Sequence, residues 1–302
     1  MTRSLITGAG GFVGKHLIDH LTTAGDEVHG IDREVDVTDR GVLESAISAV
    51  GPQVIYHLAA MTHVGESWHH PDDFTRVNVV GTLNVLESAR RAAPEAVVLV
   101  VSSADVYGVV DVAQLPIDES HPPRPVSPYA QSKIEAEHAA REAAHHGQRV
   151  VIVRPFNHIG PGQTTTFVVP AIASRLLEAR DNGATSVAVG DLSARRDFCD
   201  VRDVVRAYRL LSSFGVAGEV YNVASGHDVS ISDIAQWLVG RIAPQVRLEV
   251  SEDLLRPVEI PVSRGSFAKL QRTTGWEPRI TLATSLEDVV VALDEGRGNQ
   301  HT

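Results

Sequence analysis

The sequence predicts a doubly wound parallel α/β sheet with a smaller carboxy-terminal lobe. In the first half of the chain, short apolar runs alternate with segments of helical pattern, which is typical of βαβ units joined by right-handed crossovers. A glycine-rich turn, "TGAGGFVG", follows the first apolar run directly. After Pro155 the alternation loosens, and a second lobe is expected from there.

The expected elements follow in a regular order. Five short, β-branched runs predict strands covered on both faces: "SLITGAG", "EVHGID", "VIYHLAA", "AVVLVVSS" and "RVVIVRP". Helices are expected at about 12–24, 39–49, 74–92, 128–147, 168–182, 201–214 and 230–241. The segment "FNHIGPGQTTT" is interpreted as a long loop, "SVAVG" and "EVYNVA" as strands, and two short helical patterns follow "RPVEIPVS". We expect one domain over 1–155, to which parts of 156–230 return, and a lobe mainly over 156–302.

Composition restricts the class of protein. The 302 residues carry a formal net charge of −11, with 43% hydrophobic and 22% charged residues, the balance of a soluble globular protein. The acidic total gives no sign of a nucleic-acid polymer or an anionic membrane as partner. Cys199 has no cysteine to pair with, so it suits a reducing compartment and a packing role. With no long apolar run and no signal-peptide pattern, we expect a cytoplasmic protein.

The first turn has the glycine spacing of a diphosphate site. Gly8, Gly11 and Gly14 follow the first strand and open the first helix in a G-x-x-G-x-x-G pattern that encloses Phe12 and Val13. Glycine has no Cβ to block a pyrophosphate, and the helix N-terminus offers N–H groups and the positive end of its dipole. Such a turn can also serve only as a connection, but its place after the first strand favours dinucleotide binding.

The end of the second strand predicts which dinucleotide is preferred. Asp32 lies 18 residues after Gly14, where a carboxylate can accept hydrogen bonds from ribose hydroxyls. The same charge repels a 2′-phosphate, so NAD is favoured over NADP, although the adjacent Arg33 could admit NADP. Asp36 is expected near the adenine amino group.

A tyrosine and a lysine mark the predicted chemical centre. Tyr129 and Lys133 are four residues apart in the helix that Ser127 begins, so they share one helical face. An ammonium beside a phenol favours the phenolate, and we expect it to lower the pKa of Tyr129. Such a tyrosine can take a proton from a sugar hydroxyl or return one to a ketone. Ser103 ends the preceding strand at the carboxyl edge of the sheet, where ligands bind in such folds.

With these motifs in order, the chain resembles the extended short-chain dehydrogenase/reductase family that acts on sugar nucleotides. The matching segments are "TGAGGFVG", Asp32, "HLAA" at 57–60, Asn78, "SSADVYG", Tyr129 with Lys133, and "RPFNHIGPGQ". The resemblance implies a Rossmann fold and a catalytic group of Ser103, Tyr129 and Lys133 over a bound nicotinamide. It implies further cofactor contacts from Val37, Leu58, Ala59, Ala60, Asn78 and Pro155.

The second half of the chain is most similar to the GDP-6-deoxy-4-keto-mannose reductases and next to the GDP-mannose 4,6-dehydratases. This resemblance implies that Asn157 holds the phosphate or sugar, that Arg196 and Arg256 hold the diphosphate, and that Glu259 holds the nucleotide ribose. Arginine suits a diphosphate because its planar fork pairs two oxygens. Further substrate contacts are expected from Thr62, His63, Ser103, Asp105 and Gln163.

The residues after the serine favour simple redox chemistry. Dehydratases usually carry an additional Glu there, whereas this chain has Ala104 and Asp105. We therefore expect NAD(P)H-dependent reduction of the C4 ketone of a nucleotide-linked 6-deoxy-4-keto sugar, GDP-6-deoxy-4-keto-mannose first, with Tyr129 as proton donor. A UDP-glucose 4-epimerase-like activity is the alternative, since those enzymes share "SSA" and "VYG", and a dehydratase comes third. A non-catalytic nucleotide sensor would not need the Ser–Tyr–Lys group.

Two expectations concern metals and partners. The adjacent histidine pairs at 69–70 and 145–146 lack the further ligands of a metal site, so no metal is expected. The helices at 74–92 and 128–147 carry apolar residues beyond one stripe, and in the family such helices pair across a two-fold axis. A homodimer is therefore expected.

Overall fold

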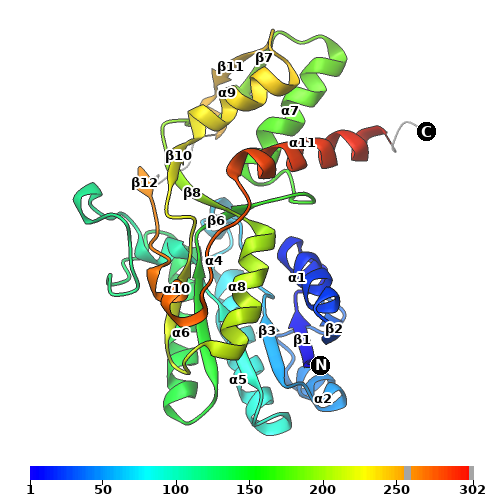
Figure 1. The fold of residues 1–302 in the computed structure, drawn as a ribbon, viewed down its shortest axis with the longest axis vertical. Coiled ribbons are helices and arrows are strands. Elements are labelled where there is room, and N and C mark those ends of the chain that lie inside the picture. Colours follow the sequence, from blue (N-terminus) through cyan, green and yellow to red (C-terminus); the bar gives the residue numbers. More distant parts are fainter. Residues whose placement is uncertain (255–259, 299–302) are drawn as a thin grey trace.

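The computed structural model describes residues 1–254 and 260–298 (Figure 1). Its main body is built on a six-stranded sheet in the order β2-β1-β3-β4-β5-β9, in which every pair of neighbours is parallel. The predicted doubly wound α/β sheet is confirmed. These strands are β1 (Arg3–Thr7), β2 (Glu27–Ile31), β3 (Val54–His57), β4 (Val97–Val101), β5 (Val150–Pro155) and β9 (Val220–Val223).

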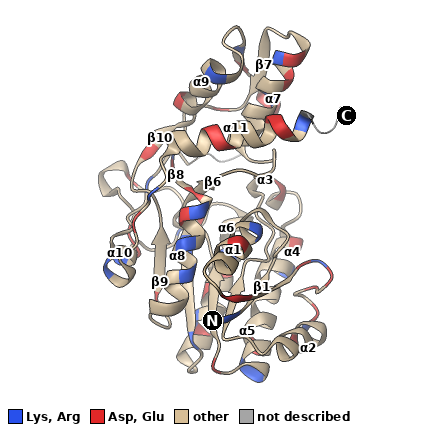
Figure 2. Cartoon of the chain, turned by 45° about the vertical axis from the view of Figure 1, so that its right-hand side comes forward, with Lys and Arg blue, Asp and Glu red and all other residues tan. Residues whose placement is uncertain are grey.

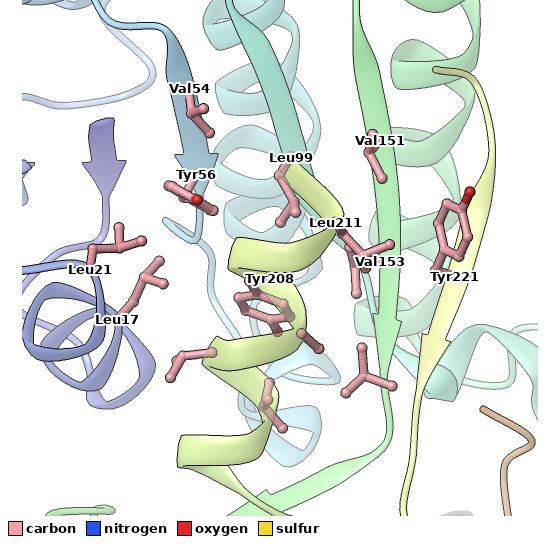
Figure 3. Packing of buried hydrophobic residues seen from close by; sticks show 14 of the residues in the cluster. Leu17, Leu21, Val54, Tyr56, Leu99, Val151, Val153, Tyr208, Leu211 and Tyr221 are labelled. Atoms are coloured by element: carbon pink, nitrogen blue, oxygen red, sulfur yellow. The ribbon is translucent and has the colours of Figure 1, made fainter. Parts of the chain in front are cut away.

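Helices cover both faces of this sheet. One face packs against α1 (Phe12–Thr23) and α8 (Val201–Phe214), and Figure 3 shows their side chains meeting those of β3, β4, β5 and β9. The other face packs against α2 (Arg40–Val50), α5 (Gly81–Ala92) and α6 (Pro128–His145). Successive strand residues point to opposite faces, and both faces are buried, which explains the unbroken apolar runs.

A second lobe lies at one end of the molecule (Figure 1). It contains α7 (Val168–Asn182), α9 (Ile231–Ile242), α11 (Leu282–Gly298) and the strand pair of β7 (Ser186–Val189) with β11 (Arg247–Val250). Between the bodies, β8 (Arg195–Asp200) pairs with β6 (Asn157–Ile159), β10 (Asp228–Ser230) and β12 (Val262–Ser263). The chain returns to the main body through β9, α8 and α10 (Ala268–Thr274), which packs against α8 and β9.

Two local predictions were wrong. The helix expected at 74–92 is α4 (Pro71–Phe74), a π-helical turn η1 (Thr75–Val80) and then α5. At that turn the Thr82 hydroxyl donates to the Asn78 carbonyl, an oxygen that a regular α-helix would offer to the Thr82 backbone N–H. The loop expected after Pro155 contains β6, because its backbone pairs in parallel with β8, 41 positions further along (Asn157 opposite Phe198).

The remaining described elements are short. They are α3 (Val64–Ser67), η2 (Ala104–Tyr107), η3 (Val112–Gln114) and η4 (Glu252–Leu254). Within the described residues, every helix is too short or too polar to cross a membrane.

The basic positions along α8 in Figure 2 are engaged in ion pairs. Arg206 pairs with Asp203 at 2.7 Å and Arg209 with Asp26 at 3.0 Å. Arg202 pairs with both Asp200 and Asp288 at 2.7 Å. Arg202 and Arg209 therefore link α8 to other segments, whereas the ion pair of Arg206 lies within the helix.

Three buried aspartates of "RRDFCDVRD" tie later segments to β8 and α8. Asp197 accepts hydrogen bonds from the backbone N–H groups of Ser225, Gly226 and Gly265. Asp200 accepts from the Ser285 hydroxyl at the start of α11, and Asp203 accepts from the N–H groups of Arg279 and Ile280. Cys199 is buried in the same segment, and burial raises the pKa of its thiol, so it packs as an apolar residue.

Candidate active site

The glycine-rich turn lies between β1, the loop after β3 and the start of α1. Gly8 has φ +71°, and a Cβ atom there would lie 2.8 Å from the Ala59 nitrogen. A Cβ on Gly14 would lie 2.6 Å from the Ala9 carbonyl oxygen. Gly11 precedes α1 and caps it with no side chain. The glycines therefore let the turn pack closely against the loop after β3 and the start of α1. The helix N-terminus beside them offers N–H groups, and these residues fit a dinucleotide pyrophosphate.

Asp32 lies directly against this turn. Its Oδ2 accepts the Gly10 N–H at 2.9 Å, and a Cβ on Gly10 would run into the carboxylate. The backbone N–H of Asp32 donates to the Glu34 carboxylate at 2.7 Å. The end of β2 is therefore fixed by hydrogen bonds to Gly10 and to Glu34. Arg33 is exposed beside it. Gly10 was not among the predicted cofactor residues, although its spacing to Gly8 made it visible in the sequence.

Three further residues predicted to contact the cofactor, Asp36, Val37 and Pro155, make contacts within the protein near this turn. Asp36 accepts the Thr38 N–H at 2.8 Å, which lowers the pKa of its carboxyl. Val37 is buried against α5, where a Cβ on Gly81 would lie 2.8 Å from Val37 Cγ2. Pro155 is buried at the end of β5, where it pairs in register with Val223 of β9.

A buried hydrogen-bond chain supports the loop that carries Leu58, Ala59 and Ala60. The Thr7 hydroxyl lies 2.8 Å from His57 Nδ1 and accepts the Ala59 N–H at 3.2 Å. His57 Nε2 lies 3.0 Å from the Thr82 hydroxyl. Burial lowers the pKa of His57 to about 3, so the ring stays neutral and acts in positioning.

Asn78 connects the same loop to the catalytic helix. Its Oδ1 accepts the Met61 N–H at 2.8 Å, and its Nδ2 donates to the Met61 carbonyl and to the Ser132 hydroxyl. Ser132 in turn donates to the Tyr129 carbonyl at 2.7 Å. Both ends of the Asn78 amide are therefore bound to the protein, so Asn78 holds the loop after β3 against α6.

The structure brings Ser103 and Tyr129 together. Ser103 is the N-cap of η2, and its Oγ accepts the Asp105 N–H at 3.2 Å. Tyr129 lies in the first turn of α6, behind the N-cap Ser127 and the N1 proline Pro128. The Ser103 hydroxyl lies close enough to the Tyr129 phenol to favour its ionised form, which acts to lower the pKa of the tyrosine. A hydroxyl pair at the carboxyl edge of β4 can hold and protonate a carbonyl oxygen.

The electrostatics of the tyrosine differ from the prediction. We expected Lys133 to lower the pKa of Tyr129; instead burial, with the nearby Asp105 charge, raises it, and only the Ser103 hydrogen bond acts in the other direction. Lys133 Nζ donates to the Val101 carbonyl at 2.9 Å. Burial lowers the pKa of Lys133 to about 8, against the opposing charge of Glu137. The phenol is therefore protonated at neutral pH.

The predicted substrate residues are spread around this edge. Thr62 and Asn157 are exposed, and Asp105 is half-buried on η2. His63 is the N-cap of α3, with Nδ1 accepting the Glu66 N–H at 3.1 Å. Gln163 is buried, and its Nε2 donates to the His158 carbonyl at 3.1 Å.

The predicted diphosphate arginines divide between the described and undescribed parts of the chain. Arg196, on β8, donates to the Ile260 carbonyl at 2.6 Å and to the Arg195 carbonyl at 2.9 Å. It therefore holds the start of the segment that leads to β12. Arg256 and Glu259 lie outside the described residues.

One buried group beside Lys133 was missed from the sequence. Glu137 follows Lys133 by one helical turn, and its carboxylate binds Ser102 and the Arg154 guanidinium. The signal was the spacing of four residues, which places Glu137 on the helical face of the tyrosine and lysine.

Comparisons with known proteins identify the family of the chain. Residues 4–224 match the model of the NAD dependent epimerase/dehydratase family. The chain is 39% identical to GDP-6-deoxy-D-mannose reductase of Pseudomonas aeruginosa, over 95% of this chain and 96% of that protein. It is 30% identical to UDP-glucose 4-epimerase of Mycolicibacterium smegmatis, over 95% and 97%. The structure of RMD from Pseudomonas aeruginosa complexed with NADPH matches with a TM-score of 0.89 and 37% identity, covering 98% of this chain and 100% of that one.

The fold and the arrangement at its edge define an enzyme of the short-chain dehydrogenase/reductase type that works with nucleotide sugars. The chain belongs to the NAD dependent epimerase/dehydratase family. The predicted resemblance to the extended branch of these enzymes is confirmed.

Proposed function

We propose that the protein reduces the C4 ketone of GDP-6-deoxy-4-keto-mannose to an alcohol, with NADH or NADPH as reductant. The observation that carries this proposal is the 39% identity to GDP-6-deoxy-D-mannose reductase over 95% of the chain. The glycine-rich turn, Asp32 and the Ser103–Tyr129 pair supply the two parts that such a reaction needs, a dinucleotide cradle and a proton donor.

In this reaction the reduced nicotinamide, when bound, supplies a hydride to C4. Ser103 orients the ketone oxygen, and Tyr129 donates its phenolic proton to that oxygen, so that a C–H and an O–H bond form together. The raised pKa of Tyr129 keeps the proton in place until the hydride arrives. The phenolate then regains a proton from water, and the ammonium of Lys133 stabilises it in the meantime.

The proposed cofactor preference follows from the turn after β2. The Asp32 carboxylate, beside Gly10, can hold ribose hydroxyls and makes NADH usable. The relative of known structure contains NADPH, and the exposed Arg33 of this chain can pair with a 2′-phosphate. We therefore propose that the enzyme uses both, with NADH preferred.

We propose that the substrate lies between η2 and the second lobe. Asp105, His63, Thr62 and Gln163 would surround the sugar, and Asn157 the phosphate or sugar. The diphosphate and the nucleotide ribose would lie against Arg196, Arg256 and Glu259, where a guanidinium fork matches phosphate oxygens.

The test uses the purified protein with NADH or NADPH and a set of nucleotide sugars. Added GDP-6-deoxy-4-keto-mannose should oxidise the reduced cofactor stoichiometrically, measured by absorbance, and yield the 4-hydroxy sugar by mass spectrometry and NMR. Tightly held NAD⁺ and interconversion of UDP-glucose with UDP-galactose without added cofactor would establish the epimerase instead. Loss of water from GDP-mannose would establish a dehydratase.

We also propose that the enzyme is a homodimer formed through η1, α5 and α6. Val80 and Leu83 are three residues apart on one helical face and are 41% and 47% exposed. Such a face can pair with its own copy across a two-fold axis. Light scattering at micromolar concentration should give twice the chain mass, and Leu83→Glu should give the monomer. Val112→Glu, at an apolar residue 65% exposed on η3, is the control that should remain dimeric.

A further inference from the structure

A buried ion pair lies directly behind the catalytic group. The Glu137 carboxylate accepts Arg154 Nε at 2.7 Å and Arg154 Nη2 at 2.6 Å, and each of the two side chains is 1% exposed. Desolvating two charges generally cancels the gain from pairing them, so a buried ion pair is weak evidence for stability alone. Its place next to Ser103 and Lys133 indicates a role in the site.

This pair contacts both ends of the segment that carries Ser103. At one end, the Ser102 hydroxyl donates to Glu137 Oε1 at 2.6 Å. At the other end, the Arg154 guanidinium lies 4.7 Å from the centre of the Tyr107 ring, and the Tyr107 hydroxyl donates to Asn222 at 2.7 Å. The turn that carries Ser103 is thus fixed at one end by Ser102 and at the other by Tyr107, both through buried contacts with the ion pair.

The same carboxylate acts on Lys133. The ammonium donates to the carbonyl of Val101, next to Ser102, and Glu137 is one helical turn away. A buried ammonium is costly unless a negative charge lies near. The other titratable or charged groups on the elements packed here are neutral His57 on β3, cationic Arg154 on β5, and Tyr107, Asp105 and Tyr129 on η2 and α6. A second cation, Arg141 on α6, lies 3.7 Å from the Glu137 carboxylate.

We propose that Glu137 is a positioning residue for the reduction. Together with Arg154 it keeps Ser103 in line with Tyr129, and its charge keeps Lys133 in the ammonium form. This inference rests on the proposed function for its chemistry, but its charge effect on Lys133 is a property of the protein itself.

The first experiment measures that property without substrate or cofactor. The chain has three lysines, Lys15, Lys133 and Lys269, so a protein labelled with ¹³C at lysine Cε gives a spectrum that Lys133→Arg assigns. In Glu137→Gln, the midpoint of the Lys133 titration should fall by about one pH unit or more relative to the wild type. Since this change leaves Arg154 unpaired, Glu137→Gln/Arg154→Gln is measured alongside. A smaller fall in the same direction is expected there, because the Arg154 cation no longer opposes the charge of Lys133.

The second experiment measures turnover against pH. In Glu137→Gln, the pH above which kcat declines should move lower, in step with the lysine titration. Ser102→Ala keeps the carboxylate but removes its hydrogen bond to the segment that carries Ser103, so it should lower kcat about tenfold without moving the titration. Asp203→Asn, a buried carboxylate outside the site, should lower the melting temperature and leave the pH profile in place.

The outcomes separate the two proposals. An unchanged Lys133 titration in both Glu137 variants, or a pH profile that moves equally in Asp203→Asn, would overturn the positioning role. Absence of turnover in the wild type would refute the reductase and leave the lysine titration to decide the charge effect.

Discussion

Two segments of this chain place polar residues in or next to a strand and have different roles. Residues 102–108 ("SSADVYG") follow β4, and residues 195–203 ("RRDFCDVRD") form β8 and the start of α8. In the first segment, Ser102 and Tyr107 are held by Glu137 and Arg154, while Ser103 lies near Tyr129. In the second, Asp197 and Asp203 accept backbone N–H groups from segments that follow much later in the chain.

The difference teaches that polar residues in or next to a strand do not by themselves mark chemistry. Each buried aspartate of the second segment satisfies N–H groups that would otherwise be buried without a partner. In the first segment, Ser102 and Tyr107 donate to the buried side chains of Glu137 and Asn222, and Ser103 lies at the site. The predictions below separate these roles by measuring turnover and stability independently.

The largest expected effect is on turnover in Tyr129→Phe. The change removes the proton donor, so kcat should fall by ~10²–10⁴-fold while the unfolding free energy changes little. Tyr208→Phe is the matched control: Tyr208 is fully buried, and its hydroxyl has no hydrogen-bond partner among the described residues. That variant should keep wild-type kcat, and a similar loss in both would contradict the assignment.

Lys133→Met should separate function from stability. Turnover should fall by ~10²-fold or more, because no cation remains to stabilise the phenolate. Stability should rise at neutral pH, by about 1–3 kcal/mol, because the native state no longer contains a buried ammonium whose pKa is lowered to about 8. Urea unfolding and steady-state kinetics on the same preparation measure both. A variant that is less stable but fully active per folded molecule would show that the lysine is structural.

Asp203→Asn, in the segment 195–203, should lower stability and leave turnover unchanged. Weaker acceptance of the Arg279 and Ile280 N–H groups, and loss of the charge facing Arg206, should lower the unfolding free energy by ~2 kcal/mol. Turnover per folded molecule should match the wild type, as measured by kcat after correction for the folded fraction. A change in kcat as large as that of a site variant would remove the distinction between the segments.

The smallest expected effect is the change of kcat and of stability with pH in the wild-type protein. Lys133 loses its proton as pH rises through about 8, so kcat should fall about tenfold per unit above that pH. Stability should move in the opposite direction: between about pH 8 and 10.5 the unfolded chain holds a proton that the native chain lacks, so this group favours folding increasingly as pH rises. Activity and unfolding measured in one buffer series test the sign, and a parallel decline of both would exclude Lys133 as the cause.

Much of the fold followed from local patterns. The helices at 168–182 and 201–214 were predicted to the residue, since each has a clear apolar period, and Gly183, with φ +72°, ends the first. The π-helical turn at 75–80 could not be predicted, because it depends on Thr82 and on contacts of Asn78 with Met61 and Ser132. The strand at 157–159 depends in the same way on a partner 41 positions away.

By itself the sequence determined the sheet, the glycine-rich turn and the Tyr129–Lys133 pair, because strand alternation, glycine spacing and helical spacing are local properties of a chain. Only the tertiary structure decided that Ser103 reaches Tyr129, that Lys133 binds Val101, and that burial raises the pKa of Tyr129. Hydrogen-bond partners and desolvation depend on what packs around a group. Those neighbours come from β4, β5 and α6, and local sequence patterns do not show that these elements are in contact.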